Sequence, residues 1–336
     1  MRTNTCWLLM AGTLSALACG GESALLAPET LDEYRAPLIA ANGIRTNGIR
    51  TNGILIESIR VGTDGQLMAV AIDGTQIPAA AIPELLLEST LEDGTAADVR
   101  IDSAQFDAAS GVYLYSLSQE TKPGKWSPLC GTLNKTPILA VPLPGIYDPN
   151  TGSHTPSSDA FTFGCTNGAL GKCALWGYKP WAQKTECINE TCKPQSLLAW
   201  HVSCVRMVRA DYCGDGVPHT RDGTSINVWD NLSVQLADPT SWEMEAEWTP
   251  SGARCIRHTR WKQADKKAKW ADLEYVQRTC PERLASNQPG SCDVNTSDYL
   301  AQYGLHLDSF VRRLLRNQSQ GNLTGTGQDK KGNRED

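Results

Sequence analysis

The number and placement of the cysteines limit what this chain can fold into more than any other feature. Of the 12 cysteines in 336 residues, ten lie between Cys130 and Cys292. An even set of ten thiols is typical of an oxidising compartment, where cysteines form disulfides. Zinc is the competing use, but only Cys187 and Cys192 are close in sequence and no second close pair follows. We therefore expect an exported protein whose fold is held by disulfides among these ten residues.

The first 18 residues are typical of a secretory signal peptide. Arg2 supplies one positive charge, and the apolar segment "CWLLMAGTLSALA" ends in small residues at Ala18. This segment is too short to cross a bilayer as a permanent helix. We expect cleavage here, which removes Cys6.

The four residues "ALAC", Ala16 to Cys19, resemble a bacterial lipobox, although that pattern prefers Leu at its first position. The resemblance implies cleavage before Cys19 and a lipid on this cysteine, so the membrane becomes a partner through the anchor. Gly20 stands where some inner-membrane lipoproteins carry Asp, which favours the outer membrane or cell surface. An ordinary signal peptide without lipid is the alternative.

Two different patterns follow the signal. Residues 19–53 contain the repeat "NGIRTNGIRTNGI", and we expect a lipid-anchored tether, since Asn-Gly favours turns and so few copies cannot build a solenoid. A contact made by the repeat is the alternative. Residues 54–148 alternate apolar and polar residues in segments such as "GVYLYSLS", which predicts an antiparallel β unit.

Residues 149–292 mix helical and strand patterns. The segments "TNGALGKCALWGYKPW" and "QSLLAWHVSCVRMVRADYCGDG" predict two helices, the second stopped by Gly214. Strands are predicted at "TSINVWD" and in a hairpin of "WEMEAEW" and "GARCIRHTRW", and a further helix at "ADKKAKWADLEYVQRTC". An amphipathic helix is predicted over 293–317, to pack on the body of the protein or, as the alternative, to lie on a membrane surface. Residues 318–336 are expected to form a disordered polar tail.

Several segments of this region carry a family resemblance. "FTFGCTNGALGKCALWGYKPW", "SCVRMVRADYCGDG", "HTRDGTSINVWD" and "EAEWTPSGARCIRHTRW" occur in this order and together resemble the ADYC domain. That is an uncharacterised family of exported bacterial proteins, named for the tetrapeptide that lies here at Ala210 to Cys213. The resemblance covers about residues 125–292 and implies no activity.

Cysteine spacing around the two helices predicts how they pair. Facing residues of antiparallel helices have a constant sum of residue numbers. Three pairs have nearly equal sums: Cys165 with Cys213, Cys173 with Cys204, and Cys187 with Cys192. We therefore predict an α+β fold, in which an antiparallel β unit is followed by a disulfide-stapled helical hairpin with further β-strands.

The remaining four cysteines allow three connectivities. Because a shorter loop closes more easily, the favoured pairs are Cys255 with Cys280 and Cys130 with Cys292.

The stretch around the tetrapeptide holds the candidate site residues. Asp215, His219 and Asp222 are weak candidates for hydrolase chemistry with His219 as general base, but no G-x-S-x-G nucleophile motif is present. Asp211, Asp215 and Asp222 are weak calcium candidates, because the segment lacks the EF-hand spacing and its closing Glu.

More ordinary functions for the same residues are favoured. Asp215 and Asp222 are expected to hold turns, and Arg206 and Arg209 to form a structural ion network with Asp211 or Asp215. Cys213 is expected to be bonded rather than nucleophilic, and His201 to be a packed histidine. The eight tryptophans between Trp176 and Trp270 are expected in the core rather than on a sugar-binding surface.

The formal net charge of −6 argues against a nucleic-acid partner. We therefore expect a cell-envelope lipoprotein that acts as a binding or structural module, with no cofactor and with an envelope protein or polysaccharide as its partner. The alternative is an exported hydrolase that uses Asp215, His219 and Asp222.

Overall fold

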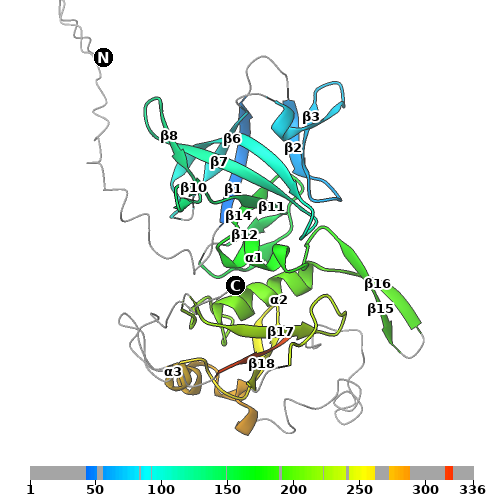
Figure 1. Ribbon diagram of the computed structural model, residues 1–336, viewed down its shortest axis with the longest axis vertical. Coiled ribbons are helices and arrows are strands. Elements are labelled where there is room, and N and C mark those ends of the chain that lie inside the picture. Colours follow the sequence, from blue (N-terminus) through cyan, green and yellow to red (C-terminus); the bar gives the residue numbers. More distant parts are fainter. Residues whose placement is uncertain are drawn as a thin grey trace, which may run out of the picture. The chain divides into compact units, whose positions relative to one another are not determined.

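The computed structural model describes residues 43–50, 56–82, 85–91, 93–148, 150–188, 191–221, 223–239, 242–261, 272–287 and 315–320, the side chains of 43–50, 186–188 and 191 excepted. The chain divides into Met1–Ala36 and Pro37–Asp336, and every described residue belongs to the second unit (Figure 1). Cys19, Asp222 and Cys292 lie outside the described residues, as does the signal peptide.

The largest element is an antiparallel sheet of seven strands. In sheet order these are β11 (Ala140–Pro144), β14 (Phe161–Cys165), β1 (Gly43–Arg50), β5 (Leu86–Thr90), β6 (Ala96–Asp107), β7 (Val112–Lys122) and β8 (Lys125–Pro128). Strand β11 also pairs with β7, so the sheet closes on itself. Its enclosed face buries an apolar core that includes Leu87, Val99, Tyr115 and Phe163.

Strand β1 corrects two expectations. It consists of the Asn-Gly repeat that we predicted to be a tether, and it pairs with β5 on one side and β14 on the other. The 54–148 boundary of the predicted β unit is wrong for the same reason, since the sheet needs strands from before and after it. A repeat too short to bury a core of its own can still form a strand between two neighbours that supply the core.

Three smaller antiparallel sheets come from the same part of the chain. They are β2 (Ile56–Val61), β3 (Leu67–Ala71) and β4 (Gln76–Pro78); β9 (Thr132–Leu133) with β10 (Thr136–Pro137); and β12 (Ile146–Tyr147) with β13 (His154–Thr155). Among the described residues, short 3-10 turns occur at Ala79–Ala81, Pro281–Arg283 and Ala285–Asn287.

A four-stranded antiparallel sheet forms from the later part of the chain. Its order is β17 (Ile226–Asp230), β20 (Leu315–Ser319), β18 (Glu243–Thr249) and β19 (Gly252–Ile256). The helix α2 (Leu198–Arg209) packs against β18, β19 and β20, and also against α1 (Ala169–Leu175), as Figure 1 shows. Because α2 is covered from several directions, nearly all of its side chains are buried.

The two helices do not form a simple helical hairpin. Where we predicted the turn between them, β15 (Gln183–Ile188) and β16 (Thr191–Ser196) form an antiparallel β-hairpin. Cys187 lies opposite Cys192 in its register, and Cys192 is disulfide-bonded. A constant sum of residue numbers indicates antiparallel pairing, which strands share with helices, so it could not determine the element type.

The disulfides confirm one predicted pair and contradict three others. Cys173 bonds to Cys204 and joins α1 to α2 as predicted. The predicted pairs of Cys165 with Cys213, of Cys255 with Cys280 and of Cys130 with Cys292 are wrong. The observed bonds are Cys130–Cys165 and Cys213–Cys280, and Cys255 is also disulfide-bonded. Cys165 lies in strand β14 of the large sheet, so its partner is Cys130 in the turn after β8 rather than a cysteine beside α1 and α2.

The C-terminal expectations are also corrected where the chain is described. Leu315 and Arg316 were placed in an amphipathic helix and Gln318 in a disordered tail, but all three belong to β20, between β17 and β18. The strand fills a gap in a sheet, and this long-range pairing overrides the local helical pattern. By contrast, β17, the β18–β19 hairpin and α3 (Asp272–Thr279) lie where we predicted them. None of the described helices has the length and apolar character needed to cross a membrane.

Candidate functional site

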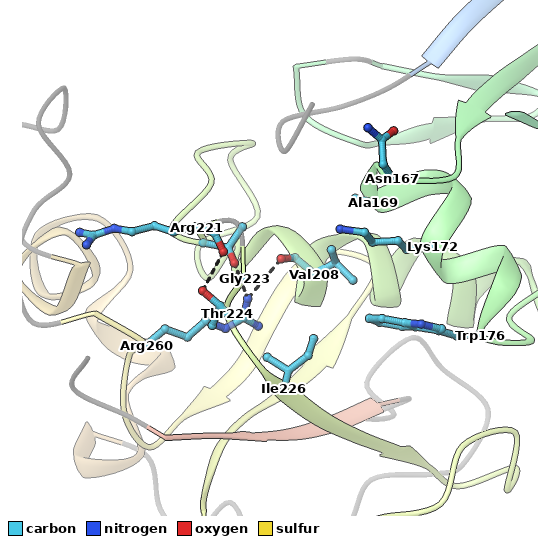
Figure 2. A pocket seen from close by; sticks show the side chains of 11 residues that line it. Asn167, Ala169, Lys172, Trp176, Val208, Arg221, Gly223, Thr224, Ile226 and Arg260 are labelled. Carbon is cyan, nitrogen blue, oxygen red and sulfur yellow. Dashed lines mark hydrogen bonds between the residues drawn. The ribbon is translucent and has the colours of Figure 1, made fainter. Parts of the chain in front are cut away.

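A pocket of about 260 Å³ opens beside the helices α1 and α2 (Figure 2). Its walls come from α1, from Val208 on α2, from Ile226 at the start of β17, and from Arg260. The loop before β17 contributes Thr220, Arg221, Gly223 and Thr224. Small-molecule sites are commonly concave and mostly apolar, with a few placed polar groups, and this pocket lies near the small end of their size range.

One stripe of α1 forms the first wall. Ala169, Lys172 and Trp176 are spaced by three and four residues, so they lie on the same side of the helix. Figure 2 shows Lys172 and Trp176 projecting from α1 toward Val208 and Ile226. The neighbouring residue Cys173 fastens α1 to α2 through its disulfide, which fixes the position of this stripe.

Arg260 forms the opposite wall and is held on all sides. Its Nε donates to both carboxylate oxygens of Glu245 at 3.0 and 2.9 Å, and its Nη1 donates to Thr220 Oγ1 at 2.9 Å and to the Val208 carbonyl at 3.2 Å. Nη2 donates to the Met207 carbonyl at 2.6 Å. Burial opposes its charge, but the Glu245 carboxylate raises the pKa of Arg260. Arg260 is therefore an ion-paired structural residue that presents Thr220 to the pocket.

In the described part of the chain, Asp215 and His219 form hydrogen bonds with different partners and none with each other. The carboxylate of Asp215 accepts from its neighbouring backbone at Val217 and from the Tyr275 hydroxyl at 2.7 Å. His219 Nδ1 instead lies 3.1 Å from the carboxylate of Asp272, a residue that the sequence did not single out. The third candidate, Asp222, lies outside the described residues. The hydrogen bond from the Val217 amide to Asp215 agrees with the expectation that Asp215 holds a turn.

The His219–Asp272 pair is buried, with 6% and 7% of the two side chains exposed. His219 Nε2 and Asp272 Oδ2 have no hydrogen-bond partner in the part of the chain that the structure describes. The ring of Tyr275 packs 4.6 Å from that of His219, and burial together with the Asp215 bond raises the pKa of Tyr275 to about 12. No described hydroxyl or thiol hydrogen-bonds to His219, so the pair lacks a nucleophile among these residues.

The two calcium candidates that the structure describes, Asp211 and Asp215, both bind protein groups. Asp211 pairs with Arg206 and accepts from the Gly216 amide at 3.1 Å. Burial raises the pKa of Asp211, and the Arg206 guanidinium opposes this rise. Across the described ranges, no group of three or more His, Cys, Asp or Glu side chains could hold a metal ion.

Each residue of the tetrapeptide has a structural contact. Ala210 ends α2 in the left-handed conformation, with φ of 52°, so the helix ends four residues before the predicted stop at Gly214. Tyr212 is fully buried, donates to Glu245 Oε1 at 3.0 Å and stacks on Trp248 at 5.5 Å. Cys213 bonds to Cys280, directly after α3.

A comparison of the sequence with known protein families supports the resemblance that this motif suggested. The sequence model of the ADYC domain matches residues 80–262. The chain belongs to the ADYC domain family. The match begins in the 3-10 turn before β5, earlier than the boundary at 149 that we predicted, so the ADYC domain includes most strands of both sheets. No curated protein and no solved structure matches the chain.

Two arginines of α2 fasten the ADYC motif to the loop after β12. Arg206 donates to Asp211, to the Thr151 carbonyl and to Ser153 Oγ, and Arg209 donates to the carbonyls of Asn150 and Gly216. This confirms the predicted structural ion pair of Arg206 with Asp211, whereas the hydrogen bonds of Arg209 go to backbone carbonyls.

The sequence analysis missed the pocket. Lys172 and Thr220 are far apart in the sequence, and although both lie in segments of the family resemblance, no catalytic or ligand-binding motif marks either of them. Trp176 was noted only as one of several tryptophans, of which Trp200, Trp248 and Trp261 are buried as expected.

Proposed function

We propose that this ADYC-domain protein is an exported binding module of the cell envelope whose pocket beside α1 holds a small molecule. The observation that carries the proposal is the concave site itself, in which Trp176, Val208 and Ile226 supply apolar surface and Lys172 and Thr220 supply polar groups. The even cysteine set and the disulfides support an oxidising compartment, and the N-terminal sequence supports lipid anchoring at Cys19.

A hydrolase is the weaker alternative. His219 has an acidic partner in Asp272, as general bases often do, but the described residues give it no nucleophile. The proposed binding function needs no such group.

The test is a pocket-filling substitution with a matched control. Val208→Phe adds a ring at the pocket wall, whereas Val217→Phe makes the same change at an exposed residue that does not line it. The disulfide-bonded protein would be screened by thermal unfolding against a library of small neutral and charged molecules. A ligand at 100 times its Kd stabilises the folded state by about 2.7 kcal/mol.

We expect at least one compound to raise the unfolding temperature of the wild type and of Val217→Phe, but not of Val208→Phe. The proposal fails if no compound stabilises the wild type, or if Val208→Phe responds as strongly as the control.

A further inference from the structure

We infer that the pocket takes a small organic carboxylate, held at its charged end by Lys172 and along its apolar body by Trp176. The inference rests on the proposed binding function and specifies the class of its ligand. It starts from the charges of the lining residues. The described residues that line the pocket include three cationic side chains and no acidic one.

Two of these three cations already have partners. Arg260 is paired with the buried carboxylate of Glu245. The guanidinium of Arg221 lies 4.0 Å from the centroid of the Trp261 ring, and Figure 2 shows this side chain extending away from Lys172 and Trp176. Neither residue is therefore placed to supply the main charge for a ligand.

Lys172 differs from both. Within the described part of the chain, it makes no hydrogen bond and no ion pair, although the side chain is half-buried at the pocket wall. An ammonium group has three donors, and in a partly dry site it gains most from an anionic acceptor. Because α1 is tied to α2 beside it, little ordering of the backbone is needed when a ligand binds.

Thr220 provides a second donor. Its Oγ1 already accepts from Arg260, so its own hydroxyl hydrogen is free to point elsewhere. One ammonium and one hydroxyl match the two oxygens of a carboxylate. A phosphate group carries more acceptor oxygens and more charge than these two donors satisfy, so the carboxylate is favoured.

The rest of the lining sets the body of the ligand. The carbonyl of Trp176 accepts from Gln235 Nε2 at 2.6 Å, which positions this residue at the end of α1. Its indole, together with Val208 and Ile226, offers an apolar wall suited to a flat or aliphatic group.

Isothermal titration with benzoate, benzamide and inorganic phosphate tests the inference. Benzoate and benzamide share a ring and differ in charge, while phosphate has charge without an apolar body. The variants are Lys172→Met, which keeps the length of the side chain without its charge, and Lys193→Met, the same change at an exposed residue of β16. Circular dichroism melts would establish that both variants fold.

We expect benzoate to bind the wild type and Lys193→Met at least tenfold more tightly than benzamide, since a charged hydrogen bond contributes about that much. Lys172→Met should remove this preference. The inference is overturned if benzamide binds as well as benzoate, if phosphate binds more tightly than benzoate, or if Lys172→Met keeps the preference. If Val208→Phe abolishes the binding of neutral compounds and benzoate binds no more tightly than benzamide, the carboxylate inference fails and the proposed binding function stands. If no compound binds in either experiment, the proposed function fails with it.

Discussion

Acidification should destabilise this protein through His201, a fully buried residue of α2. Its Nδ1 lies 2.9 Å from the Tyr147 hydroxyl, and its Nε2 lies 3.1 Å from the Leu170 carbonyl. The carbonyl can only accept, so Nε2 donates to it and Nδ1 accepts from Tyr147. Burial lowers the pKa of His201 from 6.5 to about 3. The folded protein therefore holds this imidazole neutral across the range in which the unfolded chain protonates it.

The magnitude follows from proton linkage. As the pH falls through 6.5 the unfolded chain takes up a proton at His201, whereas the folded chain does not until about pH 3. Each pH unit within this window costs about 1.4 kcal/mol of folding free energy. Between pH 7 and pH 5 this one residue should cost about 2 kcal/mol.

Guanidinium unfolding at pH 7 and pH 5, with the disulfides intact and tryptophan fluorescence as the signal, measures this loss. His201→Asn cannot take up a proton in this range, so its loss between the two pH values should be about 2 kcal/mol smaller than that of the wild type. Tyr147→Phe serves as a control, because it removes the hydroxyl but keeps the buried imidazole. It should be less stable at both pH values and retain the acid dependence. An equal loss in His201→Asn and the wild type would refute the reasoning.

Two further predictions concern the chain turn after the motif and the N-terminus. Gly214 has φ of +73°, and a Cβ added to it would lie 1.9 Å from the Ser251 carbonyl oxygen. Gly214→Ala should therefore reduce the free energy of unfolding by at least about 2 kcal/mol more than Gly124→Ala, where φ is +74° and nothing lies within 4 Å of the added Cβ. Equal losses of unfolding free energy for the two variants in urea melts would show that no such clash occurs. If Cys19 carries the proposed lipid anchor, Cys19→Ser should release the protein from the membrane fraction. A variant that still fractionates with membranes would show that no lipid at Cys19 anchors it.

Local patterns predicted the local elements of this fold. The spacing of apolar residues predicted α2, and the alternation of residues on either side of the turn at Pro250 and Ser251 predicted the β18–β19 hairpin. The end of α2 was misplaced because Ala210, and not a glycine, takes the left-handed conformation. That choice depends on the contacts of the following residues, which no local pattern contains.

Long-range pairings could not be predicted in the same way. Strand β1 comes from a repeat whose residues favour turns, and β20 comes from a segment with helical periodicity, yet each fills a place between two strands that are distant in the sequence. The partner of Cys213 depended on where α3 packs, and Asp272 became the partner of His219 for the same reason. In each case the decisive free energy comes from tertiary packing, which outweighs local preference.

The ADYC motif and the pocket are connected through bonds between buried side chains. Tyr212 donates to Glu245, the same carboxylate binds Arg260, and Arg260 donates to Thr220 at the pocket wall. Because burial and the neighbouring Glu245 raise the pKa of Tyr212 well above 10, this hydroxyl remains a donor throughout the physiological range. For the proposed binding function, the motif therefore needs no reactive group of its own. It fixes the carboxylate that neutralises Arg260, and Lys172 remains as the cation that we propose for the ligand.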